Sequence, residues 1–275
     1  MWHVRFGKQA DRAREISTHA NHARFDCTFG ELRATDISCF DCVVPLDLPD
    51  YDEVRWNEGY WGRKFWSPHP DHVKLCDDKL SLNRFLLDSE FAALVPPLRE
   101  SNSDQFPYIL KRRRDEWGRN SFVIRNVEDE RMLADLVASP DYFRQAYVYG
   151  REEYAVHILM VDNTVEYAQT VKYEMGSASW IKGEKAAPES IVYLPPDDYL
   201  AVFARLLTKI GYCGTCCIDY KMDNGRPMLL EINPRVGASL TRDIDRYLDA
   251  YLRSLGLSDS RVWNVLRRAL KTRRK

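Results

Sequence analysis

Short apolar runs separated by polar turns recur along the chain, and their lengths predict a mixed α/β protein. The segments Trp2–Phe6 and 42–45 are typical of strands, and residues 8 to about 20 between them are typical of a helix. These segments form a β-α-β pattern. Residues 1–75 therefore predict a short α/β domain.

The middle of the chain continues the mixed pattern. Apolar residues recur at helical spacing after Asp77, which we expect to be the N-cap, and the proline pair at 96–97 stops this helix. A second helical pattern covers residues 198–210. Strands are expected at 106–111, 121–124, 145–148 and 153–159. The whole chain therefore belongs to the α/β (α+β) class.

Two apolar runs, 217–220 and 229–235, flank Asn224-Gly225, which is a strong hairpin signal. Residues two apart on a strand point the same way. Glu231, Asn233 and Arg235 are therefore expected on one face. The hairpin brings Asp219 beside them.

Carboxylate and amide oxygens are ligands suited to Mg²⁺, which binds few protein groups and bridges phosphates. Asp219, Glu231 and Asn233 supply such oxygens, and the guanidinium of Arg235 suits a phosphoryl or acyl group that carries developing charge. The alternative is an amphipathic hairpin with solvated charges. The apolar flanking residues favour the metal site, because strands seldom bury three polar groups without a ligand.

This hairpin resembles the metal-binding end of ATP-grasp enzymes, in which an acidic residue precedes E-x-N-x-R by about twelve residues. The EINPR strand is similar to that of carboxylate–amine ligases and carbamoyl-phosphate synthases. The resemblance implies an ATP-grasp fold with two lobes that clamp ATP, behind the short N-terminal domain. The first lobe would span 76–148 and the second 149–255, with a basic helix at 256–275.

The resemblance also implies a set of nucleotide contacts. Lysines 79 and 111 would hold phosphates, the 146–148 backbone would bind the adenine edge, and Glu153 would hold the ribose. Gln145 stands where glutamate is common, which should weaken adenine binding without abolishing it. The implied ATP-binding residues are Lys79, Ile109, Lys111, Gln145, Ala146, Tyr147, Val148, Glu153 and Leu230. Taken alone, Lys79 is also typical of a solvated first-turn lysine, and Ile109 and Leu230 are typical of core positions.

Three further features leave alternatives open. The loop 112–120 holds only Gly118 and is rich in arginine, so it predicts either phosphate contacts or an exposed basic loop. Lys182 is either a substrate lysine or a solvated one. Ser239 and Arg242, after the metal strand, are candidate substrate contacts.

Composition and charge limit the partners and the cellular compartment that we expect for the protein. A net charge of −1 gives no overall attraction to nucleic acid, which is not expected as a partner, and no apolar run reaches the length of a membrane span. Seven cysteines, an odd number, behind an N-terminus without a secretory segment predict the reducing cytoplasm. The segment 261–275 predicts a basic amphipathic helix. It is typical of a docked terminal helix or of one that touches anionic surfaces.

Two cysteine pairs, Cys39-x-x-Cys42 and Cys213-x-x-Cys216, have the local spacing of half a zinc site. About 170 residues separate the pairs, which is not the spacing of a zinc finger or ribbon. Both pairs also lie in apolar, strand-like runs. Buried thiols are therefore the expectation, and zinc is the alternative.

The resemblance to ATP-grasp enzymes implies an ATP- and Mg²⁺- (or Mn²⁺-) dependent carboxylate–amine ligase. It would form an amide or peptide bond through an acyl phosphate and release ADP and phosphate, with Lys111 and Arg235 as the catalytic residues. The partners would be a small carboxylate and an amine. A phosphotransferase and a nucleotide-binding subunit of a larger ligase assembly remain alternatives. A homodimer or a partner subunit is also left open.

Overall fold

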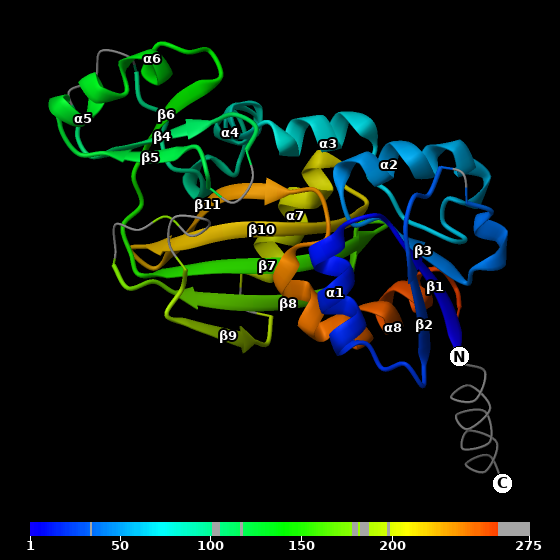
Figure 1. Cartoon of the computed structure of the whole chain (residues 1–275). Coiled ribbons are helices and arrows are strands. Elements are labelled where there is room, and N and C mark those ends of the chain that lie inside the picture. The colour runs from blue at the N-terminus through cyan, green and yellow to red at the C-terminus, as the bar shows by residue number, and fades with distance from the viewer. Residues whose placement is uncertain are drawn as a thin grey trace, which may run out of the picture. The chain divides into compact units, whose positions relative to one another are not determined.

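A computed structural model of the chain describes residues 1–33, 35–100, 105–115, 118–177, 181, 187–196 and 199–257 (Figure 1). Contacts between residues divide the chain into two units. One unit joins residues 1–67 to the chain from residue 240 onward, and the other spans residues 68–239. Among the described residues, no helix is both long and apolar enough to cross a bilayer.

The first unit is built on a parallel sheet in the order β2-β1-β3. Its strands are β1 (Trp2–Phe6), β2 (Phe25–Phe29) and β3 (Cys42–Val44), and its helices are α1 (Ala10–His19), α2 (Leu48–Val54) and α8 (Ile244–Ser254). Short 3₁₀ helices cover η1 (Ile37–Cys39) and η2 (Arg55–Tyr60). Within this unit, Tyr251 of α8 donates its hydroxyl to the Val43 carbonyl at 2.9 Å and accepts the Trp66 backbone N–H at 2.8 Å. The C-terminal helix therefore packs against the N-terminal sheet.

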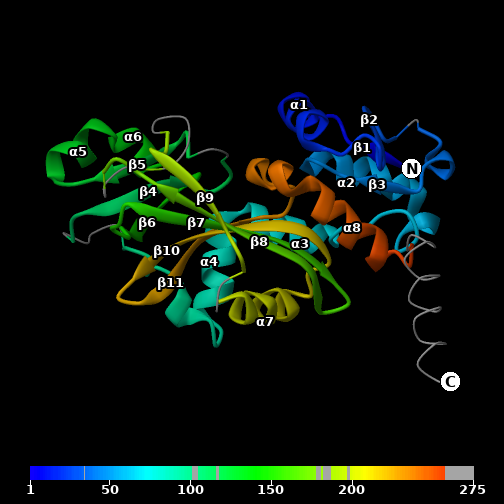
Figure 2. The same ribbon diagram turned by 90° about the horizontal axis from the view of Figure 1, so that it is seen from below.

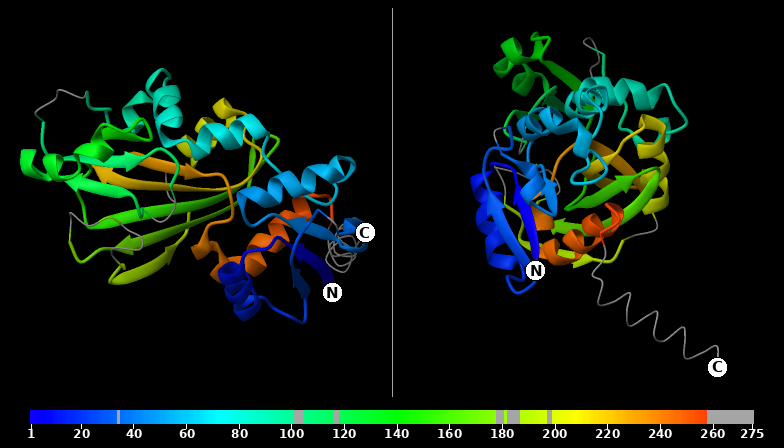
Figure 3. Two further views of the ribbon diagram at one scale, coloured as in Figure 1. Left: turned by 45° about the horizontal axis from the view of Figure 1, so that its top comes forward. Right: turned by 90° about the vertical axis from the view of Figure 1, so that its right-hand side faces the viewer.

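The second unit contains two antiparallel sheets. The large sheet has the order β11-β10-β7-β8-β9, and the small sheet has the order β5-β4-β6. The strands of the large sheet are β7 (Glu152–Val161), β8 (Thr164–Glu174), β9 (Ser190–Leu194), β10 (Gly214–Asp223) and β11 (Arg226–Asn233). Those of the small sheet are β4 (Tyr108–Arg112), β5 (Ser121–Ile124) and β6 (Tyr142–Ala146). The large sheet twists along its length (Figure 3).

Helices cover one face of the large sheet and leave the other for polar side chains. The helices of this unit are α3 (Pro70–Asp77), α4 (Lys79–Leu87), α5 (Val127–Met132), α6 (Ala134–Val137) and α7 (Leu200–Ile210), with η3 (Ala92–Leu94), and η4 (Ala238–Asp243) runs across the boundary into the first unit. Leu82 of α4 and Phe203 of α7 pack with Ile218 of β10 in one buried cluster. Figure 2 shows the large sheet between α7 and the small sheet. Because side chains alternate along strands, the neighbours of Ile218 face the opposite side.

Several predicted elements appear where the pattern placed them. The strand at 121–124 has the predicted bounds, and the mixed α/β class is confirmed. The N-cap of α4 was predicted wrongly. Asp77 ends α3, whereas Asp78 caps α4 by accepting the Ser81 backbone N–H at 3.2 Å. Two adjacent acidic residues had made the cap ambiguous.

The cysteines are free thiols in mixed surroundings. Cys42 and Cys216 are buried as expected, but Cys213 is half-buried and Cys39 is exposed. Cys39 was expected in a strand, and it ends the 3₁₀ helix η1 instead. Side chains of a 3₁₀ turn do not alternate between core and solvent as those of a strand do. The Cys39 side chain is therefore exposed. Most of the predicted basic helix, beyond residue 257, lies outside the described residues.

Candidate active site

The predicted hairpin at 217–235 is confirmed as strands β10 and β11. Asn224 and Gly225 adopt φ values of 49° and 77° at its tip, the left-handed conformation that a two-residue hairpin turn requires. Asp219 lies directly opposite Glu231, and Cys217 lies opposite Asn233. The two carboxylates and the amide therefore share the face of the sheet that the helices leave open.

Contacts within this set show that it attracts positive groups. The Asn233 side-chain amide donates to Asp219 Oδ2 at 3.1 Å and to Glu231 Oε1 at 2.9 Å. One partially positive nitrogen thus lies between two carboxylates. Rotation of the amide by 180° would present its oxygen instead. Two carboxylates and an amide oxygen would then converge, which fits a divalent cation that keeps water or phosphate in its other positions.

Arg235 lies beyond the end of β11 rather than on it, so the expectation that it shares the strand face is wrong. Its backbone N–H donates to the Asn233 carbonyl at 2.8 Å, which marks a tight turn after the last strand residue. The proline at position 234 favours such a turn, because it cannot donate to a strand ladder. The Arg235 residue is 8% exposed, and so its charge is held inside the unit.

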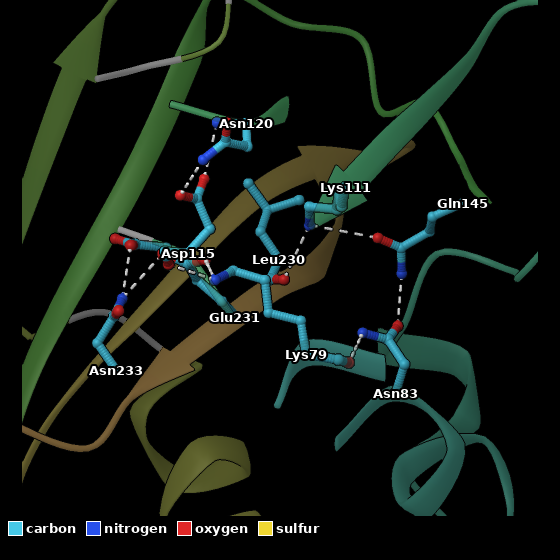
Figure 4. A network of polar contacts seen from close by, with 10 residues as sticks. Lys79, Asn83, Lys111, Asp115, Asn120, Gln145, Leu230, Glu231 and Asn233 are labelled. Carbon is cyan, nitrogen blue, oxygen red and sulfur yellow. Dashed lines mark hydrogen bonds and ion pairs between the residues drawn. The ribbon is translucent and has the colours of Figure 1, made fainter. Parts of the chain in front are cut away.

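Two buried lysines approach the hairpin from different elements (Figure 4). Lys79, the first residue of α4, places its ammonium 3.2 Å from Glu231 Oε2 and donates to the Asp115 carbonyl at 2.6 Å. Lys111, on β4 of the small sheet, donates to the Leu230 carbonyl at 3.1 Å. Elements that are distant in sequence thus bring both predicted phosphate lysines to β11.

Burial and charge together set the protonation of this cluster. Burial alone would raise the pKa of Glu231, but the ammonium groups of Lys79 and Lys111 lower that pKa to about 2. Burial lowers the pKa of Lys111 to about 8, although the negative charge of Glu231 opposes this effect. At neutral pH the cluster therefore holds an ionised carboxylate and a lysine that is still mostly protonated and loses its proton above pH 8.

A chain of buried amides supports Lys111 from behind. The Gln145 side-chain oxygen accepts a hydrogen bond from the Lys111 ammonium at 3.3 Å, and its nitrogen donates to the Asn83 side chain and to the Pro96 carbonyl. Asn83 in turn donates to the Lys79 carbonyl at 2.7 Å. Every Gln145 group thus has a partner in the protein. In this structure Gln145 orients the lysine instead of presenting a free amide to a base.

The predicted hinge follows β6. Gln145 and Ala146 end that strand, and the Ala146 N–H already donates to the Pro97 carbonyl at 2.8 Å. Tyr147 and Val148 lie in the loop between β6 and β7. Glu153 is 6% exposed on β7, and it alternates onto the same open face as the metal set. Ile109 lies on β4 two residues before Lys111, so the two side chains point to the same face of the small sheet.

The arginine-rich loop is tied to carboxylates in its described part. Arg113 donates from its Nε to Asp78 Oδ1 at 3.1 Å, and Arg114 lies 3.6 Å from an oxygen of Asp77. The Asp115 carboxylate accepts from Asn120 and closes the loop. These contacts hold the loop against the start of α4, beside Lys79.

Two of the remaining predicted substrate residues, Ser239 and Arg242, lie in η4. Ser239 contacts the open face, with its hydroxyl 2.7 Å from both His157 Nε2 and the Tyr173 hydroxyl. Arg242 is exposed and belongs to the other unit. Lys182 lies outside the described residues.

Sequence reasoning missed several buried polar residues of this unit, among them Asn83, His157 and Lys221. Lys221 could have been found, because it lies two residues after Asp219 and therefore shares its strand face. His157 could be found only through the pairing that sets it opposite Cys217. Among the described residues, no group of three or more His, Cys, Asp and Glu side chains could hold a metal ion. The hairpin set relies on an amide for its third oxygen.

Solved structures of ligases match most of the chain. D-alanine–D-alanine ligase from Bacillus anthracis matches with 11% identity and a TM-score of 0.60, over 93% of this chain and 99% of that one. L-amino acid ligase from Bacillus licheniformis matches with 13% identity and a TM-score of 0.61, over 94% of this chain and 75% of that one. N5-carboxyaminoimidazole synthetase from Staphylococcus aureus, complexed with ADP, matches with 14% identity and a TM-score of 0.60, over 94% of this chain and 78% of that one.

No protein-family profile matches the chain, and no curated protein matches it either. At identities of 11–14%, the similarity to these ligases lies in the arrangement of helices and strands. The chain has the ATP-grasp fold.

Proposed function

We propose that this protein is an ATP- and Mg²⁺-dependent carboxylate–amine ligase. One observation carries the proposal. Lys79 and Lys111, from separate elements, meet the Asp219–Glu231 hairpin at contacts of 3.1–3.2 Å. A triphosphate needs cations and a metal site in this close arrangement. The neighbours by fold include enzymes that were solved as complexes with ATP or with ADP.

The reaction has two steps. A substrate carboxylate oxygen attacks the γ-phosphorus of ATP, the bond to the β-phosphate oxygen breaks, and ADP leaves. An amine then attacks the acyl phosphate, the carbon–oxygen bond breaks, and inorganic phosphate leaves as the amide forms. Lys79 and Lys111 would bind the phosphates through both steps. Arg235 would neutralise the acyl phosphate.

Asp219, Glu231 and Asn233 would hold Mg²⁺ or Mn²⁺, which would neutralise phosphate charge. The ion pair between Lys79 and Glu231 would be broken when ATP and the metal ion bind. Incoming phosphates compete for the Lys79 ammonium and release the carboxylate. The pairing of Lys79 with Glu231 avoids the cost of two isolated buried ions.

Hydroxylamine provides the test, because a small strong nucleophile intercepts an acyl phosphate as a hydroxamate. The protein is incubated with ATP, Mg²⁺ and a pool of amino acids and small carboxylic acids, with and without hydroxylamine. We expect hydroxamate that depends on ATP and is lost in Lys111→Ala. Lys172→Ala is the matched control, because Lys172 forms a partly exposed ion pair with Glu152 at 2.9 Å.

Other outcomes separate the alternatives. A stable phosphorylated alcohol with ADP, and no hydroxamate from any acid, would identify a phosphotransferase that uses the same residues on a hydroxyl. Binding of ATP without any turnover would identify a nucleotide-binding subunit. Either result would overturn the ligase proposal.

A further inference from the structure

Lys221 is a buried lysine with no part in the proposed reaction. It lies on β10 two residues after Asp219, on the open face of the large sheet, and is 4% exposed. β10 pairs with β7, and the last pair in that register is Tyr220 with Tyr154. One position further along, Lys221 adjoins Glu153, the expected ribose residue. Lys221 therefore lies beside the residue expected to hold the nucleoside half of ATP.

The Lys221 ammonium donates to the carbonyl of Gly150 at 3.0 Å. Gly150 belongs to the loop that joins β6 to β7 and lies two residues after 146–148, the segment expected to bind the adenine edge. Its φ of +137° is a conformation that residues with a Cβ rarely adopt, so the direction of this carbonyl depends on glycine. A buried cation thus fixes one point of a loop whose neighbouring Tyr149 is 57% exposed.

We propose that Lys221 is a positioning residue for the nucleoside half of ATP: through Gly150 it holds the loop that follows the expected 146–148 hinge against β10, in the conformation that binds the base. This proposal rests on the proposed nucleotide site and adds a residue to it. A hinge already fixed before binding loses less conformational freedom when the base arrives, so affinity increases without a new ligand contact. The aliphatic stem of Lys221 also gives β10 apolar surface beneath the hinge.

The location predicts a specific binding signature. A residue that acts at the hinge should affect every ligand that carries adenosine, whatever the number of its phosphates. It should have no effect on a ligand that lacks the base. Phosphate lysines should behave in the opposite way, with effects that grow from AMP to ATP.

The experiment compares Lys221→Met with Lys172→Met. Both variants remove an ammonium from the same sheet and keep an unbranched stem. Lys172 lies opposite Tyr154, whose ring packs on the helix-covered face, so the control substitution is on the other side of the sheet. Dissociation constants for AMP, ADP, ATP and tripolyphosphate are measured by calorimetry with Mg²⁺, together with KM and kcat for ATP.

For Lys221→Met we expect the Kd of all three nucleotides to rise by about tenfold, the loss typical of one charged hydrogen bond. Tripolyphosphate binding should be unchanged, and KM should rise while kcat stays within about twofold. Lys172→Met should match the wild type. Lys221→Arg, which keeps the charge and the donors, should recover most of the affinity and serves as the test if Lys221→Met does not fold.

Unchanged nucleotide affinity in Lys221→Met, or a loss that grows with phosphate number, would overturn this inference. Equal losses in Lys221→Arg and Lys221→Met would overturn it as well, since the donor would then be irrelevant. Failure of the wild type to bind ATP would instead contradict the proposed function. The two proposals can thus fail separately.

Discussion

The charged side chains of the candidate site contact one another and neighbouring amide and carbonyl groups. Glu231 faces Lys79 on one side and accepts the Asn233 amide on the other, while Lys111 is bonded to a carbonyl and to the neutral Gln145 amide. Buried charges persist only when they are paired in this way. Removal of one member therefore changes the protonation and the ligand affinity of the others.

Glu231→Gln should remove nearly all ATP turnover, by about a hundredfold or more, because one of two carboxylate charges is lost where the cation would be held. The side chain keeps its shape and can still accept from Asn233, so the fold should survive. ADP release is measured at saturating and limiting Mg²⁺, with circular dichroism as the check on folding. Turnover near the wild-type level at limiting Mg²⁺ would show that the hairpin does not hold the metal.

The pKa of about 8 for Lys111 predicts a pH dependence for nucleotide binding. The protonated lysine attracts phosphate and the neutral one does not, so affinity for ADP should be full below pH 8. It should fall as the pH rises above 8, by up to about tenfold per pH unit until the pKa of the bound form is reached. Calorimetry between pH 7 and 9.5 tests this. Lys111→Met should bind ADP weakly, with no decrease across that range. An identical decrease in the variant would assign the titration to another group.

At the scale of elements, the sequence predicted local structure better than contacts between distant segments. Alternation and the Asn224-Gly225 turn identified the hairpin and its facing residues, because both signals lie within a few residues. Periodicity could not show that α4 reaches β11, or that the amide of Gln145 would turn toward Lys111. Burial of distant apolar faces decides those contacts. The turn at Arg235 was missed because the strand pattern continues past the proline that ends it.

The turn after β11 depends on a glycine that packs against His157. A Cβ on Gly237 would lie 2.4 Å from His157 Cε1, and His157 is fully buried. Gly237→Ala should therefore displace the turn that carries Arg235 and destabilise the protein by about 1–3 kcal/mol. Turnover should fall more than ADP affinity, because Arg235 is expected to act on the acyl phosphate.

Urea unfolding and ADP calorimetry test this prediction. Gly59→Ala is the control, because a Cβ there meets no atom within 4 Å. Wild-type stability and turnover in Gly237→Ala would show that the turn can shift freely and that its contact with His157 does not position Arg235.

At the scale of the whole molecule, the two ends of the chain form one unit and the middle forms the other. Every residue expected to bind ATP or metal lies between positions 79 and 233, inside the unit that spans 68–239. A sequence pattern alone cannot assign α8 to the N-terminal sheet, since about 200 residues separate Val43 from Tyr251. The nucleotide site should therefore tolerate changes in the packing of the other unit.

Tyr251 offers the test of this separation. It is 1% exposed, and its hydroxyl bonds to the Val43 carbonyl and the Trp66 N–H within the first unit. Tyr251→Phe leaves both backbone groups buried without a partner, and should lower the free energy of unfolding by about 2–4 kcal/mol. Tyr60→Phe, in the same unit, changes a half-buried tyrosine and should cost little. Calorimetry well below the unfolding transition should give an ADP affinity within about twofold of the wild type for both variants. A tenfold loss in folded Tyr251→Phe would mean that the nucleotide site needs the first unit.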